Sequence, residues 1–109
     1  MATGILGSVD IQPTIDTVVY TVPSDTFAVI SVNICNRGTS ARNIRIALTS
    51  DETTLASNLG NYIEYDVELL AKGVIERTGL VLNAGTKVVV YSNNTDCSAM
   101  VYGIETSTL

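Results

Sequence analysis

The sequence contains no histidine and few charged residues. Without an imidazole, Ser-His-Asp and Cys-His catalytic arrangements and zinc sites with histidine ligands are excluded. Only 16% of the 109 residues are charged, whereas an average soluble domain has about 25%. We expect a surface this poor in charge to contact a partner.

Basic residues are particularly scarce, and the formal net charge is −5. The six basic side chains form no continuous positive stripe, which disfavours nucleic-acid binding. No apolar run approaches the roughly 20 residues that span a bilayer, and residues 1–10 lack the basic start and long apolar stretch of a secretion signal. We therefore expect no nucleic acid and no membrane as partner, and a protein made in the cytosol.

Only two cysteines are present, Cys35 and Cys97. Their spacing matches no metal site or redox motif, although strands containing them could be neighbours. A cytosolic origin favours free, buried thiols over a disulfide. The sequence predicts no metal and no cofactor.

The clearest strand signal lies in residues 27–48. Apolar side chains alternate with others at Ala28, Ile30, Val32 and Ile34, and again at Ile44, Ile46 and Leu48. This period of two places successive side chains on opposite faces of a strand. Because residues 36–43 are rich in turn-forming Asn, Gly and Ser, we predict a hairpin here, around which the rest of the sheet is built.

Further strand patterns occur in residues 14–22, 63–69, 74–82, 87–92 and 99–105, separated by turn signals. Seven or eight short strands at this spacing predict an all-β, single-domain antiparallel β-sandwich of jelly-roll or Greek-key type in residues 13–109. Residues 1–12 are interrupted by Gly4 and Gly7, which is weak for a regular strand. We expect them to form an extended N-terminal arm that is ordered by contacts with a neighbouring subunit.

Three carboxylates share one predicted strand face, Glu64, Asp66 and Glu68. Paired carboxylates can serve a glycosidase, but a domain this small can hardly enclose the cleft that a sugar needs. Calcium needs six to eight oxygen ligands, and alternate strand positions lie too far apart to surround one ion. A solvated face that discourages edge pairing is favoured, and we predict that the chain is not an enzyme.

Four of the five tyrosines have a predicted place. Tyr20, Tyr91 and Tyr102 lie inside apolar strand patterns and are expected in the core. Tyr62 lies beside the long polar connection of residues 49–61 and is expected at a protein interface, with stacking on a sugar as the alternative.

Several segments carry a resemblance to a known class of proteins: NICNRG (33–38), YIEYD (62–66), GVIERTGLVL (73–82) and VYG (101–103), with Thr21-Val22-Pro23 before them. Together they resemble small virion structural proteins of tailed bacteriophages, especially those infecting cyanobacteria. The resemblance extends from about residue 5 to residue 105. It implies a non-enzymatic β domain that binds copies of itself and a larger protein shell, either on the capsid or in the tail.

The composition and the resemblance lead to one functional hypothesis with two alternatives. The hypothesis is a capsid decoration or cement protein in the virion, trimeric, that contacts the major capsid protein through the arm and through the loops at 36–43 and 49–61. The alternatives are a tail, fibre or baseplate module with host-glycan binding, and a cellular carbohydrate-binding sandwich. The expected interface residues are Ile5, Leu6, Val9, Ile11, Arg37, Arg42, Leu55, Leu59 and Tyr62.

Overall fold

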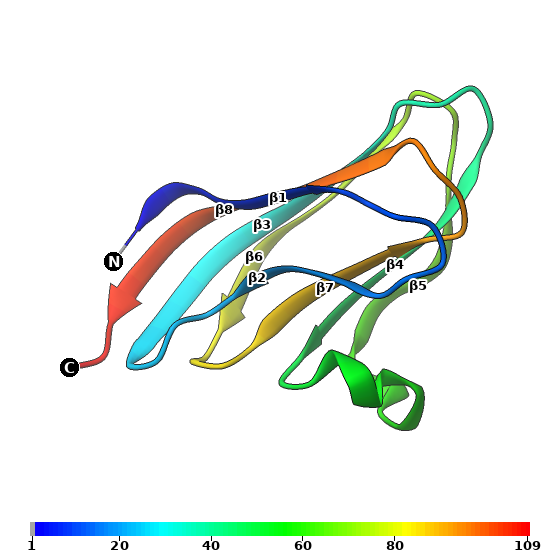
Figure 1. Cartoon of the computed structure of the whole chain (residues 1–109). Coiled ribbons are helices and arrows are strands. Elements are labelled where there is room, and N and C mark those ends of the chain that lie inside the picture. The colour runs from blue at the N-terminus through cyan, green and yellow to red at the C-terminus, as the bar shows by residue number, and fades with distance from the viewer. Residues whose placement is uncertain (1) are drawn as a thin grey trace.

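The computed structural model describes residues 2–109, and within them the chain forms eight strands and two short 3₁₀ helices (Figure 1). In chain order these are β1 (Thr3–Asp10), β2 (Thr17–Thr21), β3 (Thr26–Asn36), β4 (Arg42–Thr49), η1 (Glu52–Ser57), η2 (Leu59–Asn61), β5 (Tyr62–Leu69), β6 (Val74–Leu82), β7 (Lys87–Ser92) and β8 (Cys97–Ser107).

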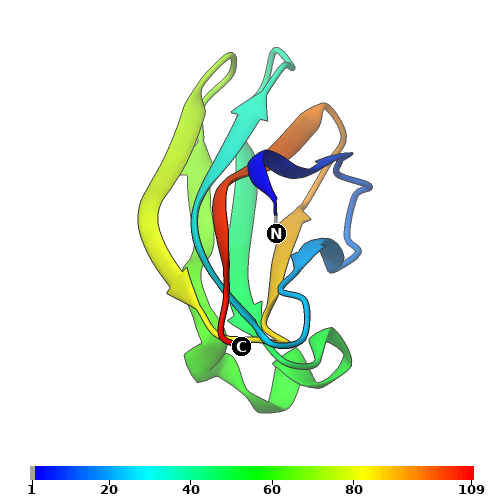
Figure 2. The same ribbon diagram turned by 90° about the vertical axis from the view of Figure 1, so that its left-hand side faces the viewer.

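The strands form two antiparallel sheets. The first sheet has the order β1-β8-β3-β6 and the second has the order β2-β7-β4-β5. Four of the strand pairs are β1 with β8, β2 with β7, β3 with β6, and β4 with β5. This is the pairing of one long antiparallel ribbon that is rolled into two layers. This is a jelly roll, and it confirms the predicted β-sandwich; Figure 2 shows the layers from the side.

The core lies between the two sheets. The alternating residues Ala28, Ile30, Val32 and Ile34 of β3 are at most 1% exposed, and they face buried residues such as Ile44 of β4 in the second sheet. Burial of each large aliphatic side chain contributes roughly 1.5–3 kcal/mol relative to exposure. The alternation therefore correctly predicted which side of β3 is buried.

The predicted hairpin of residues 27–48 is wrong. Strand β3 pairs with β6 and β8 in the first sheet, and β4 pairs with β5 and β7 in the second. The connection at residues 37–41 crosses from one sheet to the other. An alternating pattern shows which face of a strand is buried but not which strand lies beside it, so the same pattern suits two strands facing each other across a core.

The expected N-terminal arm is an edge strand of the first sheet in this structure. Residues Thr3–Asp10 pair with β8, with a bulge between Ile5 and Gly7. Both glycines have a structural role: Gly4 has φ +114°, and a Cβ at Gly7 would overlap the Val19 carbonyl oxygen of β2. The glycines that weakened the strand signal thus permit a bulged strand to lie close to the opposite sheet.

The regular alternation predicted for residues 63–69 is also interrupted. Ile44 pairs with Val67 and Ile46 pairs with Glu64, so β5 has one residue more than β4 between these pairs. Asp66 has φ +53° in this bulge. The extra residue changes the side to which the following side chains point, so the three carboxylates do not share one regular face.

Candidate interaction surfaces

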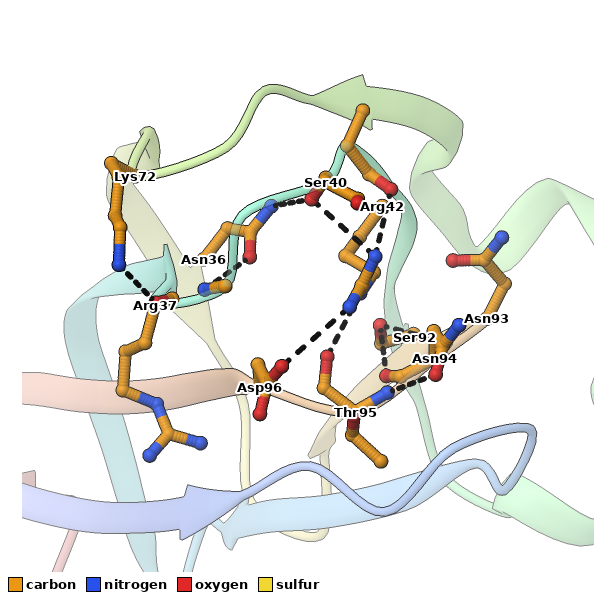
Figure 3. Close-up of polar contacts among 12 residues, drawn as sticks. Asn36, Arg37, Ser40, Arg42, Lys72, Ser92, Asn93, Asn94, Thr95 and Asp96 are labelled. Atoms are coloured by element: carbon orange, nitrogen blue, oxygen red, sulfur yellow. Dashed lines mark hydrogen bonds and ion pairs between the residues drawn. The ribbon is translucent and has the colours of Figure 1, made fainter.

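The loops at residues 37–41, 70–73 and 93–96 lie together at one end of the sandwich (Figure 3). The side chain of Arg42 is only 11% exposed and forms an ion pair with Asp96 at 3.6 Å. Its Nε donates to the Thr95 carbonyl at 2.9 Å, and its Nη1 donates to the Ala41 carbonyl at 3.2 Å. Arg42 therefore fixes two loops to each other rather than presenting a free charge.

Asn36 has the same kind of role at this end. Its buried amide donates to the carbonyl oxygens of Ser40 and Leu69 at 2.9 and 3.1 Å, and its Oδ1 accepts from the Gly38 N–H. Buried amides that satisfy several backbone groups hold loops in one conformation. This network makes the end rigid.

Two exposed cations remain beside this network. Arg37 is half exposed and pairs with Asp10 at 2.6 Å, while Lys72 donates to the Arg37 carbonyl at 2.7 Å. With Arg42, three of the six basic residues in the chain lie at this loop end. The loop end thus holds three cations, of which Arg37 and Arg42 are paired with Asp10 and Asp96.

The opposite end is formed by η1 and η2. The Asp51 carboxylate caps η1 by accepting from the backbone N–H and the hydroxyl of Thr53, and these bonds lower the pKa of Asp51. Leu55 is 1% exposed and packs against Ala47 on the outer side of the second sheet. Leu59, in contrast, is 61% exposed. One leucine anchors the segment and the other faces solvent.

The outer face of the second sheet holds a cluster of Arg45, Tyr62, Tyr65 and Tyr91. The Arg45 guanidinium lies 4.4 Å from the ring centroids of both Tyr65 and Tyr91, and its Nε is 2.6 Å from Asp66. Asp66 raises the pKa of Arg45, and Arg45 lowers the pKa of Asp66. Tyr65 and Tyr62 meet edge to face at 4.9 Å. Tyr91 is part of this outer cluster, so its predicted place in the core is wrong.

The outer face of the first sheet has an apolar region. Val29 of β3 lies between its register partners Ile104 of β8 and Val81 of β6, and these three side chains are 41%, 54% and 70% exposed. Phe27 and Ile5 extend the same face. We call the surface formed by Ile5, Phe27, Val29, Val81 and Ile104 the apolar face.

The rest of this side of the first sheet holds polar groups together with two further exposed apolar side chains, Val74 and Met100. Tyr102, predicted in the core, is only half-buried; its hydroxyl donates to Glu76, and this bond raises the pKa of Tyr102. Toward the loop end, a groove of about 480 Å³ is lined by Ser8, Val9, Asp10, Asn33, Cys35, Ser98, Ala99 and Met100. A groove lined by both polar and apolar side chains thus borders the apolar face.

The structure distributes the predicted interface residues over several places. Ile11 and Leu55 are buried, Leu6 and Val9 pack partly against the core, and Tyr62 is half-buried. Ile5, Arg37 and Leu59 remain accessible, whereas Arg42 is enclosed by loops. Among the accessible apolar residues that the sequence analysis did not select are four of the apolar face: Phe27, Val29, Val81 and Ile104. Phe27 and Val29 occupy the alternate positions of an apolar run, so the sequence contained a signal that both faces of β3 are apolar.

The two cysteines lie on neighbouring strands, as proposed, and both are free. Cys97 is fully buried, and burial raises the pKa of its thiol. Cys35 is only partly buried, because it pairs with Ser98 on the outer side of the first sheet. The expected burial therefore holds for one thiol and only in part for the other.

The acidic residues of β5 lie beside basic partners. Arg77 of β6 pairs with Glu64 at 2.9 Å and so links the first sheet to the second, while Asp66 pairs with Arg45. Among residues 2–109, no group of three or more Cys, Asp or Glu residues is arranged to hold a metal ion. Neither 3₁₀ helix in the described part of the chain has the length and apolarity to cross a membrane.

In comparisons with known proteins, no family model and no curated protein matches this chain.

Proposed function

We propose that this chain is a bacteriophage virion structural protein, a capsid decoration or cement protein that stabilises the shell by protein–protein contacts. The observation that carries the proposal is the position of accessible contact side chains at both ends of a rigid sandwich. Arg37 and Lys72 lie at the loop end, and Leu59 lies at the η1–η2 end. The major capsid protein is the proposed partner, with copies of this chain as further partners.

The separation of the two ends suits a bridge. Strand β4 connects the loop at 37–41 to the segment at 50–61, and its eight residues span roughly 26 Å at about 3.3 Å per residue. The whole molecule extends over 46 × 31 × 19 Å. A module of this length can contact two neighbouring capsomers, and the proposed localisation is therefore the virion.

The rigidity of the loop end supports the same proposal. The Asn36 and Arg42 networks hold the loops in place before any partner binds. A preorganised surface loses little conformational entropy on association, so more of its contact energy is retained as affinity. Jelly rolls occur in viral capsid proteins and in lectins, which agrees with the proposal.

A tail, fibre or baseplate module with host-glycan binding is the second candidate. It is favoured by the cluster of Arg45, Tyr65 and Tyr91, because Tyr65 is 53% exposed and sugars stack on accessible aromatic rings. Binding on a glycan array that is lost in Tyr65→Ala would support this candidate against cement.

The test of the decoration role is addition of the purified chain to shells that lack it, followed by electron microscopy. We expect density on the shell and at least a tenfold loss of occupancy in Leu59→Glu and in Arg37→Glu, since each places a carboxylate at a contact surface. Thr78→Glu is the matched control, because Thr78 is exposed on β6 away from both ends.

Point substitutions are required, since deletion of residues 1–11 would remove β1. Density at the tail would reject decoration in favour of the second candidate, and absence from the particle would reject both.

A further inference from the structure

We infer that the apolar face binds a second copy of this chain, with the first sheets of two molecules packed against each other across a two-fold axis. The centre of the contact is the row formed by Val81, Val29 and Ile104, which lie directly beside one another on three adjacent strands. Ile5 and Phe27 border this row. Side chains on adjacent strands form a continuous surface rather than scattered apolar points.

The apolar face supplies more than half of the area that a stable dimer needs. The apolar face with its neighbours exposes on the order of 500 Å², near the upper limit for the largest patch on a free monomer. A stable interface takes about 800 Å² from each partner. The broad side of the molecule measures 46 × 31 Å, so the flanking positions of the same sheet, including the exposed Met100 and Val74, can supply the remainder.

The distribution of charge points to a second copy as the occupant. The chain has a net charge of −5, so two copies repel each other unless they meet through a region without charge. Among the outward positions of the first sheet, acidic side chains occur only near its margins: Asp10 pairs with Arg37, and Glu76 accepts from Tyr102. The central row carries no charge. A positively charged partner would find no carboxylate to pair with in this row. A second copy of the chain can pack its own central row against it without bringing like charges together.

On the outer side of the second sheet, an apolar surface is covered by a segment of the chain itself. There, η1 places Leu55 over Ala47 and Val89. None of the residues from 2 to 109 covers the central row of the first sheet in this way, and Val81 is left 70% exposed. An intermolecular contact would provide the missing cover.

A face that meets itself produces an isologous contact, which joins two chains only. The inference therefore replaces the expected trimer with a dimer. The dimer rests on the proposed function in one respect, since both assume a protein that acts through contacts with other proteins. The dimer contact leaves the loop end and the η1–η2 end free to bind the shell.

The experiment is sedimentation velocity of the full chain over a wide concentration range. We expect a dimer for the wild type and at least about a 100-fold weaker dimer for Val81→Glu and for Ile104→Glu, because each dimer would then bury two carboxylates in an uncharged contact. Leu70→Glu is the matched control, since Leu70 is 63% exposed in the β5–β6 turn, outside the apolar face. It should remain dimeric. Circular dichroism and thermal melting establish that each variant is folded.

A monomeric wild type, a trimer, or a dimer that persists in both Val81→Glu and Ile104→Glu would overturn the inference. The shell-binding assay separates this result from the decoration role. A wild-type dimer that does not bind shells rejects decoration and leaves the dimer intact, whereas a monomer that decorates shells rejects the dimer alone.

Discussion

A buried hydrogen bond between Tyr20 and Glu105 joins the two sheets. Tyr20 lies on β2 and donates from its hydroxyl to Glu105 Oε2 on β8 at 2.5 Å. The other carboxylate oxygen accepts from the Ala2 N–H at 3.0 Å. The two residues are only 7% and 9% exposed. We expect Tyr20→Phe to leave one carboxylate oxygen without its partner in a largely dry site.

The stability loss expected for Tyr20→Phe follows from the charge of the acceptor, Glu105, and from its burial. Hydrogen bonds to charged groups contribute about 1.5–3 kcal/mol, and Ala2 still satisfies one oxygen after the substitution. We therefore expect Tyr20→Phe to lower the free energy of unfolding by about 2 kcal/mol. For a chain of this length, such a loss lowers the melting temperature by roughly 8–10 °C.

The same bond predicts a dependence on alkaline pH. Burial, and then the hydrogen bond to Glu105, raise the pKa of Tyr20 above its ordinary value of 10.0. The folded protein therefore keeps this proton at a pH where the unfolded chain releases it. The stabilisation is complete below pH 10.0 and is lost as the pH rises above that value. Wild type should lose stability above this pH more steeply than Tyr20→Phe does.

Urea unfolding at about pH 7 and about pH 11 measures both effects. A double-mutant cycle with Glu105→Gln should give a coupling energy above about 1 kcal/mol. Tyr102→Phe is the control, because its hydroxyl donates to Glu76 on an exposed surface, and its loss should be much smaller. The reasoning is refuted if Tyr20→Phe costs no more than Tyr102→Phe, or if wild type and Tyr20→Phe change in parallel with pH.

Two further outcomes follow from the packing. Leu55→Ala should lower the free energy of unfolding by about 2–3 kcal/mol because it opens a cavity against the second sheet, whereas the exposed Leu59→Ala should have little effect in the same urea titration. Equal losses would contradict the docking of η1. A thiol reagent should label Cys35 in the folded protein and Cys97 only after unfolding, as followed by mass spectrometry. Labelling of both thiols at the same rate would contradict the burial of Cys97.

The class of fold was predictable because a strand encodes burial locally. The alternation in β3 identified Ala28, Ile30, Val32 and Ile34 as the buried side, and all four are core residues. Turn residues separated the strands at sandwich-like spacing. The hairpin prediction failed because the choice of neighbour depends on backbone hydrogen bonds between strands distant in sequence.

The candidate contact residues were less predictable for a related reason. The sequence analysis placed both Ile11 and Arg37 at an interface. Only the fold shows that Ile11 is buried in the core, whereas Arg37 is exposed beside Asp10. The bulge at Asp66 likewise redirects the carboxylates of β5, and a one-residue register change leaves little trace in composition.

The amino-acid sequence by itself determined an all-β sandwich with identifiable buried positions and excluded chemistry that needs an imidazole, because period-two patterning and residue content are local properties. Only the tertiary structure decided that residues 3–10 join the first sheet and that Val29, Val81 and Ile104 form one apolar face. Strands that lie far apart in the chain become neighbours through long-range pairing, and a surface of this kind exists only after that pairing has formed.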